Sequence, residues 1–415
     1  MVKQYCESCG AEVTNDGSFC ISCGAKIEQK KLYSEPLRSS YSEDMQGETK
    51  VYSRPKEKEV KTRPKRKGLI AIPIILAIII IPVITLTTIS SIKTELGTFT
   101  YEVPMTVGTA VDLNVNNDIG SISIYYDDTL TNLFESVITV KGGLRASLDN
   151  AVNFNHEIVG NTTVITFNFQ NPSSSFLNMK SISHEIEIYI NPQAIVDFNV
   201  ESDTGSIDCY AENYDNVVIA NLEFASSTGS IDFIAEDMFN LTIGDVILET
   251  STGSIDFDLS SSTNSSLTAL ELATSTGSID VDLGTFTYLN CSIIDIYTST
   301  GSIDIEYTNI MYSNDIEWEV STSTGSIYLT FEQTVIPIKN ITMDFTLETS
   351  TGSIGVDCHI TASIGIEMEG ATSTGSVDLP NGHDYYISPD FALKSSQYSF
   401  HMSTSTGSIT GNVQY

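Results

Sequence analysis

Hydrophobic and polar residues alternate in a pattern that recurs along most of this 415-residue chain. The phrase Ser-Thr-Gly-Ser-Ile-Asp, or a close variant, returns at nine glycines, and the first six of them are spaced exactly 24 residues apart. The nine are Gly205, Gly229, Gly253, Gly277, Gly301, Gly325, Gly352, Gly375 and Gly407, and a related Gly-Ser-Ile occurs at Gly120. A fixed period of this length is typical of stacked coils.

Aligning the repeats on their glycines separates apolar columns from polar ones. Apolar residues stand two and four positions after each glycine, as in Ile255 and Phe257, and the position between them is mostly Asp. A second apolar alternation lies five and seven positions before the glycine, as in Val320 and Trp318. This pattern predicts that each coil contains two strands with period-2 alternation, joined at a glycine corner. The Ser and Thr residues before the glycine are expected to stack as hydroxyl ladders.

Stacking such coils buries a continuous core that no single repeat can bury alone. We therefore predict an all-β fold, with a β-solenoid of 24-residue coils over residues 201–415. Residues 93–200 alternate less regularly, and Gly160-Asn161 between two apolar runs predicts a hairpin. This part is expected to supply strands and hairpins that form the first coils and cap one end. The insert from Pro380 to His401 is expected to be a loop or a capping flap.

The acidic position of the repeat is the candidate site of the solenoid. Strands about 4.8 Å apart line up one carboxylate per coil, and like charges directly opposite one another are destabilising. Bound cations relieve such a column, since carboxylates suit Ca²⁺. The alternative, which we favour, is a solvated acidic face. The candidate cation-binding column consists of Asp208, Asp232, Asp256, Asp280 and Asp304.

The N-terminus carries a different chemistry. Cys6, Cys9, Cys20 and Cys23 form two CxxC pairs, each followed by glycine. Two such pairs close a tetrahedral four-cysteine site around zinc, which supplies the folding energy of so short a segment and leaves no open position for catalysis. We predict a structural zinc site in residues 1–27. The segment resembles the short zinc-ribbon domains of many bacterial and archaeal membrane proteins, and this resemblance implies a structural or protein-contact role.

A linker and a membrane span follow the ribbon. Residues 28–67 are polar and become basic towards Lys67, which is a composition typical of disorder. Residues 68–92 contain a long uncharged apolar run, and about 24 residues in a helix reach about 36 Å, enough to cross a bilayer. Because the basic flank precedes this transmembrane helix, we expect a single-pass cell-membrane protein with residues 1–68 in the cytoplasm and residues 93–415 outside.

Charge and cysteine usage narrow the function further. The formal net charge is −33, although basic residues crowd the segment before the span, so the outer part is strongly acidic and no nucleic-acid partner is expected. Cys209, Cys291 and Cys358 fall in apolar columns and are expected to be small core residues. The repeats are so uniform that no position stands out as a catalytic centre, and we expect no enzyme.

From about residue 110 onward the chain resembles the putative adhesin family of membrane-anchored β-solenoids. The resemblance rests on Asp118-Ile119-Gly120-Ser121-Ile122, the strand from Ile186 to Pro192 and the recurring Ser/Thr-Gly-Ser-Ile-Asp corners. It implies an adhesin-like or envelope-scaffold surface for an unidentified ligand or protein partner. The alternative is a transmembrane envelope sensor whose zinc ribbon recruits a cytoplasmic partner. The sequence leaves the oligomeric state open.

Overall fold

A computed structural model describes residues 4–5, 12–13, 94–105, 109–142, 152–169, 182–284, 291–312, 314–336 and 340–415. The chain divides into two units, Met1–Leu69 and Ile70–Tyr415. In the first unit, β1 (Gln4–Tyr5) pairs antiparallel with β2 (Glu12–Val13). The predicted zinc ligands, the linker and the transmembrane segment all lie outside the described residues. The described residues contain no helix long and apolar enough to cross a membrane.

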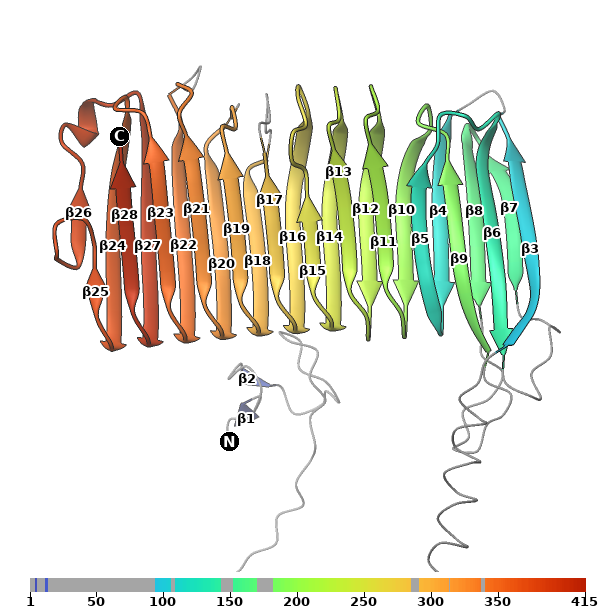
Figure 1. Ribbon diagram of the computed structural model, residues 1–415, viewed down its shortest axis with the longest axis horizontal. Coiled ribbons are helices and arrows are strands. Elements are labelled where there is room, and N and C mark those ends of the chain that lie inside the picture. Colours follow the sequence, from blue (N-terminus) through green and yellow to red (C-terminus); the bar gives the residue numbers. More distant parts are fainter. Residues whose placement is uncertain are drawn as a thin grey trace, which may run out of the picture. The chain divides into compact units, whose positions relative to one another are not determined.

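The second unit is built from two 13-stranded sheets, which we name by their place relative to the repeat glycine (Figure 1). The pre-glycine sheet runs β26 (Tyr385–Ile387), β24 (Ile364–Thr374), β27 (Ser396–Thr406), β22 (Thr342–Thr351), β20 (Ile316–Thr324), β18 (Ile293–Thr300), β16 (Ser266–Thr276), β14 (Thr242–Thr252), β12 (Val218–Ser226), β10 (Ile195–Ser202), β4 (Ala110–Asn117), β8 (Thr162–Phe169), β7 (Asn153–Val159). The post-glycine sheet runs β25 (Val377–Asp378), β28 (Ile409–Gln414), β23 (Ile354–Ile360), β21 (Ile327–Gln333), β19 (Ile303–Thr308), β17 (Ile279–Leu283), β15 (Ile255–Asp258), β13 (Ile231–Glu236), β11 (Ile207–Glu212), β5 (Gly120–Tyr126), β9 (Ile182–Ile190), β6 (Asn132–Gly142), β3 (Thr94–Pro104).

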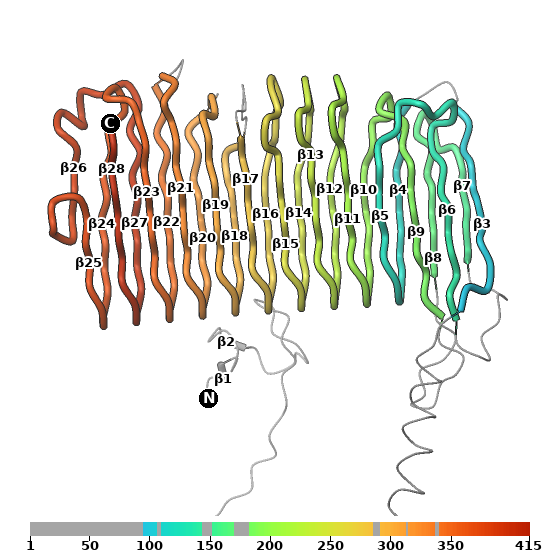
Figure 2. The backbone as a smooth tube through the Cα atoms, viewed as in Figure 1, coloured from blue at the N-terminus to red at the C-terminus, as the bar shows by residue number. Residues whose placement is uncertain are grey.

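Each regular coil contributes one strand to each sheet, and the coils stack in parallel. Equivalent residues therefore face each other across neighbouring coils, as Ile231 faces Ile255 and Phe233 faces Phe257. The inward columns form one continuous core between the sheets, and Trp318, Tyr307 and Phe331 are among its fully buried side chains. The predicted all-β solenoid and its two strands per coil are confirmed. The tube trace in Figure 2 shows the coils as a regular series.

The repeat glycine makes the corner between the two sheets. The corner glycines have φ between 132° and 156°, a backbone conformation that residues with a side chain rarely adopt. A Cβ atom at Gly253 would stand 2.1 Å from the carbonyl oxygen of Gly229 in the neighbouring coil. Glycine is therefore required both by the turn and by the close approach of successive coils.

Hydroxyl groups hold the corner to its neighbour. From Gly229 onward, the residue three positions before the glycine is a Thr or Ser whose hydroxyl donates to the glycine carbonyl of the adjacent coil, as from Thr250 to Gly229 at 2.9 Å. Thr274 bonds Gly253, and Thr298 bonds Gly277, in the same way, both at 3.0 Å. The predicted ladder therefore exists, but each rung joins a hydroxyl to a backbone carbonyl because the stagger of the coils places these two groups opposite each other.

Replacing Thr274 by valine, which has nearly the same shape, is expected to lower the free energy of unfolding by about 1–2 kcal/mol. The reason is that the carbonyl oxygen of Gly253 loses its hydroxyl donor in a part-buried position. Urea denaturation of the full chain in detergent measures the effect. Ser275→Ala, at the exposed neighbouring position, is the matched control and should change stability by less than about 0.5 kcal/mol. Equal stability of Thr274→Val and the wild type would contradict a role for the ladder.

The opposite corner uses asparagine and its relatives in left-handed conformation. Asn216, Asn240 and Asn264 have φ between 55° and 61°, and short polar side chains tolerate this region. The side-chain amide of Asn240 donates to Asn216 at 2.9 Å, and that of Asn264 donates to Asn240. This second ladder was not predicted, although the asparagines recur with the same 24-residue period.

Neither end of the solenoid follows chain order. At one end the coil made by β8 and β9 stacks outside the earlier coil made by β4 and β5, and at the other end β24 and β25 stack outside the later β27 and β28. The antiparallel strands β3, β6 and β7 close the first end, where Tyr101 packs on Phe154 with ring centroids 4.3 Å apart.

The second end is closed by part of the predicted insert. Strand β26 pairs antiparallel with β24, and the 3₁₀ turn η1 (Phe391–Leu393) lies beside Gly365 of β24. The last strand of the chain, β28, is an inner strand of its sheet, because β25 pairs with it at Ile409 and Thr410. The capping roles of residues 93–200 and of the insert are thus both seen in the described residues.

Candidate functional site

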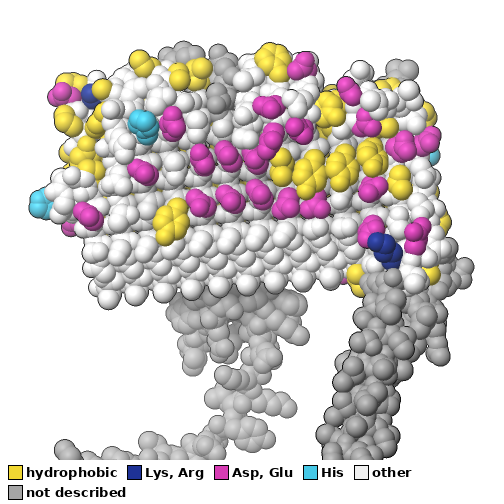
Figure 3. Space-filling view, in the orientation of Figure 1, with side chains coloured by type: hydrophobic (Ala, Val, Ile, Leu, Met, Phe, Trp, Pro, Cys, Tyr) yellow, Lys and Arg dark blue, Asp and Glu magenta, His cyan; other side chains and the backbone are white. Residues whose placement is uncertain are grey.

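The predicted acidic column lies on the outer surface of the post-glycine sheet. Parallel pairing brings Asp208, Asp232, Asp256, Asp280 and Asp304 opposite one another on five successive strands, β11 to β19. A second acidic row lies two residues further along the last three of these strands, at Asp258, Asp282 and Glu306. Figure 3 shows both rows running along the face. We call these eight carboxylates the acid ladder.

Partial burial, with crowding as a further cause at some positions, makes five carboxyl groups of the acid ladder harder to ionise. Partial burial, together with the charges of Asp280 and Asp232, raises the pKa of Asp256 to about 6. Partial burial and the charge of Asp258 raise the pKa of Asp282 to about 6. The pKa values of Asp208, Asp232 and Asp304 are also raised, in each case mainly by burial. Ionising these groups at neutral pH therefore costs free energy, first through burial and, at Asp256 and Asp282, also through repulsion between carboxylates.

Three tyrosines continue the second row of the ladder towards the N-terminal end of the same face. Tyr189, Tyr125 and Tyr210 come from β9, β5 and β11, and neighbouring rings stack with centroids 5.6 Å apart. Because the rings stack on one another, their faces are largely occupied. We therefore interpret the three tyrosines as a ladder that stabilises neighbouring strands, and we do not propose them as a ligand-binding surface.

No group of three or more His, Cys, Asp or Glu side chains within the described ranges is arranged to hold a metal ion. The acid ladder contains the carboxylates that the sequence predicted in one column, and its cation binding stays a prediction. Cys6, Cys9, Cys20 and Cys23 lie outside the described residues, so the zinc site also stays a prediction.

The predicted core cysteines are fully buried. Cys209, Cys291 and Cys358 have no exposed surface and form no disulfide. Burial raises the pKa of Cys291 to about 11 and raises those of Cys209 and Cys358 well above the usual range for a thiol. At neutral pH these thiols stay protonated and therefore unreactive.

Two hollows on the pre-glycine sheet follow the corner and were not predicted from the sequence. One segment of about 400 Å³ extends from Asn116 to Tyr297, and another of about 510 Å³ extends from Tyr297 to Ser373. A smaller hollow of about 160 Å³ shares Asn116 and Glu201 with the first segment and extends it towards β8. We call this line of neighbouring hollows the trough.

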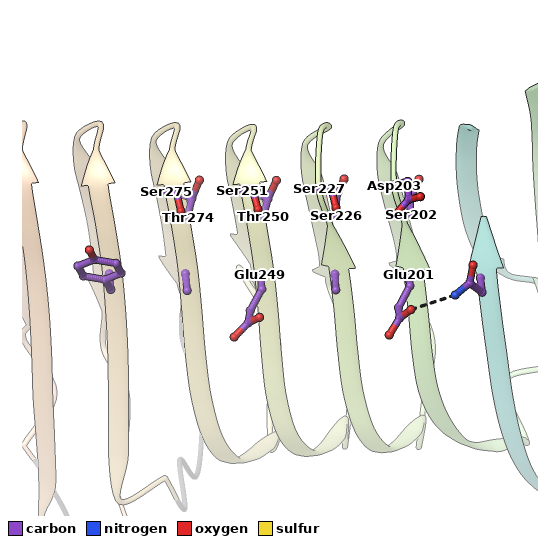
Figure 4. A pocket seen from close by; sticks show the side chains of 14 residues that line it. Glu201, Ser202, Asp203, Ser226, Ser227, Glu249, Thr250, Ser251, Thr274 and Ser275 are labelled. Atoms are coloured by element: carbon purple, nitrogen blue, oxygen red, sulfur yellow. Dashed lines mark hydrogen bonds between the residues drawn. The ribbon is translucent and has the colours of Figure 1, made fainter. Parts of the chain in front are cut away.

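The trough is lined by the residues four, three and two positions before each glycine. The position at minus four supplies carboxylates, a ring and small side chains, in the spatial order Asn116, Glu201, Ala225, Glu249, Ala273, Tyr297, Ser321, Glu348, Ser403, Ala371. The position at minus two supplies hydroxyls, most of them exposed, such as Ser251 and Ser275. Figure 4 shows Glu201 and Glu249 on the same side of the sheet as these serines.

Two features of the trough depart from its regular lining. The ring of Tyr297 borders both segments, is 41% exposed, and its hydroxyl lies 2.6 Å from the hydroxyl of Ser299. Ser202 is 3% exposed and lines the first segment, yet its hydroxyl has no hydrogen-bond partner among the described residues. The equivalent hydroxyls of later coils bond a glycine carbonyl, whereas here the side chain of Asn117 donates to the carbonyl of Gly120 at 2.9 Å.

The trough was not predicted because no single residue type marks it in the aligned repeats. The minus-four position varies among Glu, Ala, Ser and Tyr, and no residue type there points to a site until the parallel register places them side by side. The serines of the repeat phrase were visible, but their exposure depends on the corner geometry. The acidic column was visible because a single residue type recurs in it.

Two stacked parallel sheets, glycine corners and caps at both ends define a β-solenoid. The chain belongs to the Toastrack DUF4097 family, which matches residues 119–381. No curated protein matches it.

Solved structures that resemble the chain have low sequence identity and low TM-scores. One is a putative adhesin from Parabacteroides merdae, at 11% identity and a TM-score of 0.37, with 76% of this chain and 97% of that chain covered. Another is a putative adhesin from Bacteroides fragilis, at 13% identity and a TM-score of 0.33, with 76% and 98% covered. A third is a putative cell adhesion protein from Clostridium sporogenes, at 11% identity and a TM-score of 0.20, with 77% and 100% covered.

Proposed function

We propose that this chain is a non-enzymatic, single-pass membrane protein that displays its β-solenoid outside the cell as an adhesin-like or envelope-scaffold surface. The observation that carries the proposal is the trough, which repeats the same kinds of polar group along successive coils. A repeated surface of this kind suits an extended partner, because each coil can add a further contact and the contacts reinforce one another.

The anchoring part of the proposal rests on sequence. The apolar run within residues 68–92 and the basic flank before it support a span with the solenoid outside. The two CxxC pairs support structural zinc on the cytoplasmic side. The strongly acidic composition supports a soluble, exposed domain that repels nucleic acid.

The test is attachment by cells that express the full chain with an epitope tag after Tyr415. We expect an antibody to reach the tag on intact cells, and we expect these cells to adhere to surfaces coated with purified cell-envelope material. Cells expressing a chain truncated after residue 95 are the control. Attachment equal to the control, or a tag reached only after permeabilisation, would overturn the proposal.

The alternative function is a transmembrane envelope sensor, which the cytoplasmic CxxC pairs favour. The double variant Cys6→Ser/Cys9→Ser discriminates between the two functions in the same cells. If the chain is an adhesin, attachment stays at the wild-type level. If it is a sensor, the variant loses an envelope-stress response while the solenoid remains on the surface.

A further inference from the structure

We propose that the trough binds a linear, neutral glycan chain lying along the solenoid axis. The inference rests on the proposed surface function and names the chemical class of its ligand. The two main hollows of the trough follow one another along successive coils, with Tyr297 between them, so the trough suits a polymer with a short repeat better than a single small molecule.

The lining matches the chemistry of sugar hydroxyls. Hydroxyls both donate and accept hydrogen bonds, and carboxylates accept two or more. The trough offers both along its length, with Glu201, Glu249 and Glu348 beside the serines at minus two. Ala225 and Ala273 flank Glu249 in the register and leave room for a ring between carboxylates.

Tyr297 supplies the apolar contact that such a ligand needs. Sugar rings carry an apolar C–H face, and a tyrosine offers a large apolar surface with a polar tip. The contact of its hydroxyl with Ser299 fixes the ring at the junction of the two segments. In contrast to the stacked tyrosines of the post-glycine sheet, Tyr297 pairs with Ala273 and Ser321 in the neighbouring strands, so no ring there covers its face.

Electrostatics select a neutral chain over a charged polysaccharide. None of the described residues lining the trough is Lys or Arg, whereas Glu201, Asp203, Glu249 and Glu348 are acidic. A polyuronate or a phosphate-bearing polymer would meet like charge along the trough. A basic peptide would be attracted by the charge, but it would make little use of the hydroxyl rows.

The experiment measures binding of the purified full chain, in detergent, to neutral linear hexasaccharides of different linkage and to matched uronic-acid oligomers, by glycan array and then calorimetry. We expect at least one neutral oligomer to bind and the uronic-acid oligomers not to bind. Tyr297→Ala and Ser275→Arg should each weaken this binding about tenfold or more. Both substituted side chains are at the surface, and thermal melts of the variants verify the fold.

The matched controls lie on the opposite sheet. Tyr328→Ala replaces a tyrosine that is 49% exposed there, and Thr330→Arg adds the same charge at an exposed position of that sheet. Both should leave glycan binding unchanged. The inference is overturned if no neutral oligomer binds, if trough and control variants bind equally, or if the uronic-acid oligomers bind as tightly as the neutral ones. Attachment of cells without glycan binding would refute the inference and leave the proposed function standing.

Discussion

Gly253→Ala is expected to lower the free energy of unfolding by about 4 kcal/mol or more, because it introduces both an unfavourable backbone conformation and a steric clash at the corner. The Gly253 φ of 155° is unfavourable for alanine, and the new Cβ would stand 2.1 Å from the carbonyl oxygen of Gly229. Backbone atoms on both sides would have to separate, which breaks the bond from Gly253 N–H to the carbonyl of Thr276 and the hydroxyl bonds nearby. Thermal and urea unfolding of the full chain measure the loss.

Gly355→Ala is the matched control for this prediction. Gly355 lies on β23 with no strained φ, and a Cβ there would meet the ring of Tyr328 at 3.0 Å, a side chain that can move aside. We expect a change within about 1 kcal/mol for this variant. Because each coil contacts mainly its neighbours, hydrogen exchange in Gly253→Ala should rise first in β12 to β17. Equal stability of the two variants would contradict the corner argument.

The repeating half of the fold was predictable because one short phrase encodes one physical unit. Ile255 and Phe257 alternate with Asp256, and this alone indicates which side of the strand is buried. The glycine corner followed from the change of parity between the two strands. The exchange of coil order at both ends was not predictable, because β8 and β24 have the same alternating pattern as the strands that they displace.

Of the two candidate sites, one could be predicted from the sequence and the other could not. The acid ladder follows from a column of one residue type and therefore could be read from the aligned repeats. In the trough, Thr250 is buried, whereas its neighbours Glu249 and Ser251 are exposed. This follows the inward alternation of the same strand, but only the parallel register between coils shows which exposed residues lie side by side.

The second prediction with a large expected effect concerns pH. We expect the solenoid to be more stable at pH 5 than at pH 7.5. The pKa values of Asp256 and Asp282 are about 6 in the folded chain, above the value of 3.8 for an ordinary aspartate. Between these pH values the folded state binds more protons than the unfolded state, so the free energy of unfolding falls as pH rises. The contribution is complete below about pH 4 and is lost as pH passes through about 6.

Because both carboxyl groups keep contact with solvent, screening reduces the effect, and we expect a loss of about 1–2 kcal/mol between pH 5 and pH 7.5. Asp256→Asn/Asp282→Asn should remove most of this loss and raise stability at pH 7.5, whereas Asp344→Asn, at an exposed position of the other sheet, should not. Urea titrations at the two pH values measure these differences. Adding millimolar Ca²⁺ at pH 7.5 distinguishes the two interpretations of the acid ladder. If the column binds cations, Ca²⁺ raises the free energy of unfolding of the wild type but not that of the double variant. If the ladder is a solvated acidic face, Ca²⁺ changes the stability of both chains equally. A wild-type chain that becomes more stable from pH 5 to pH 7.5 would contradict the raised pKa values of Asp256 and Asp282.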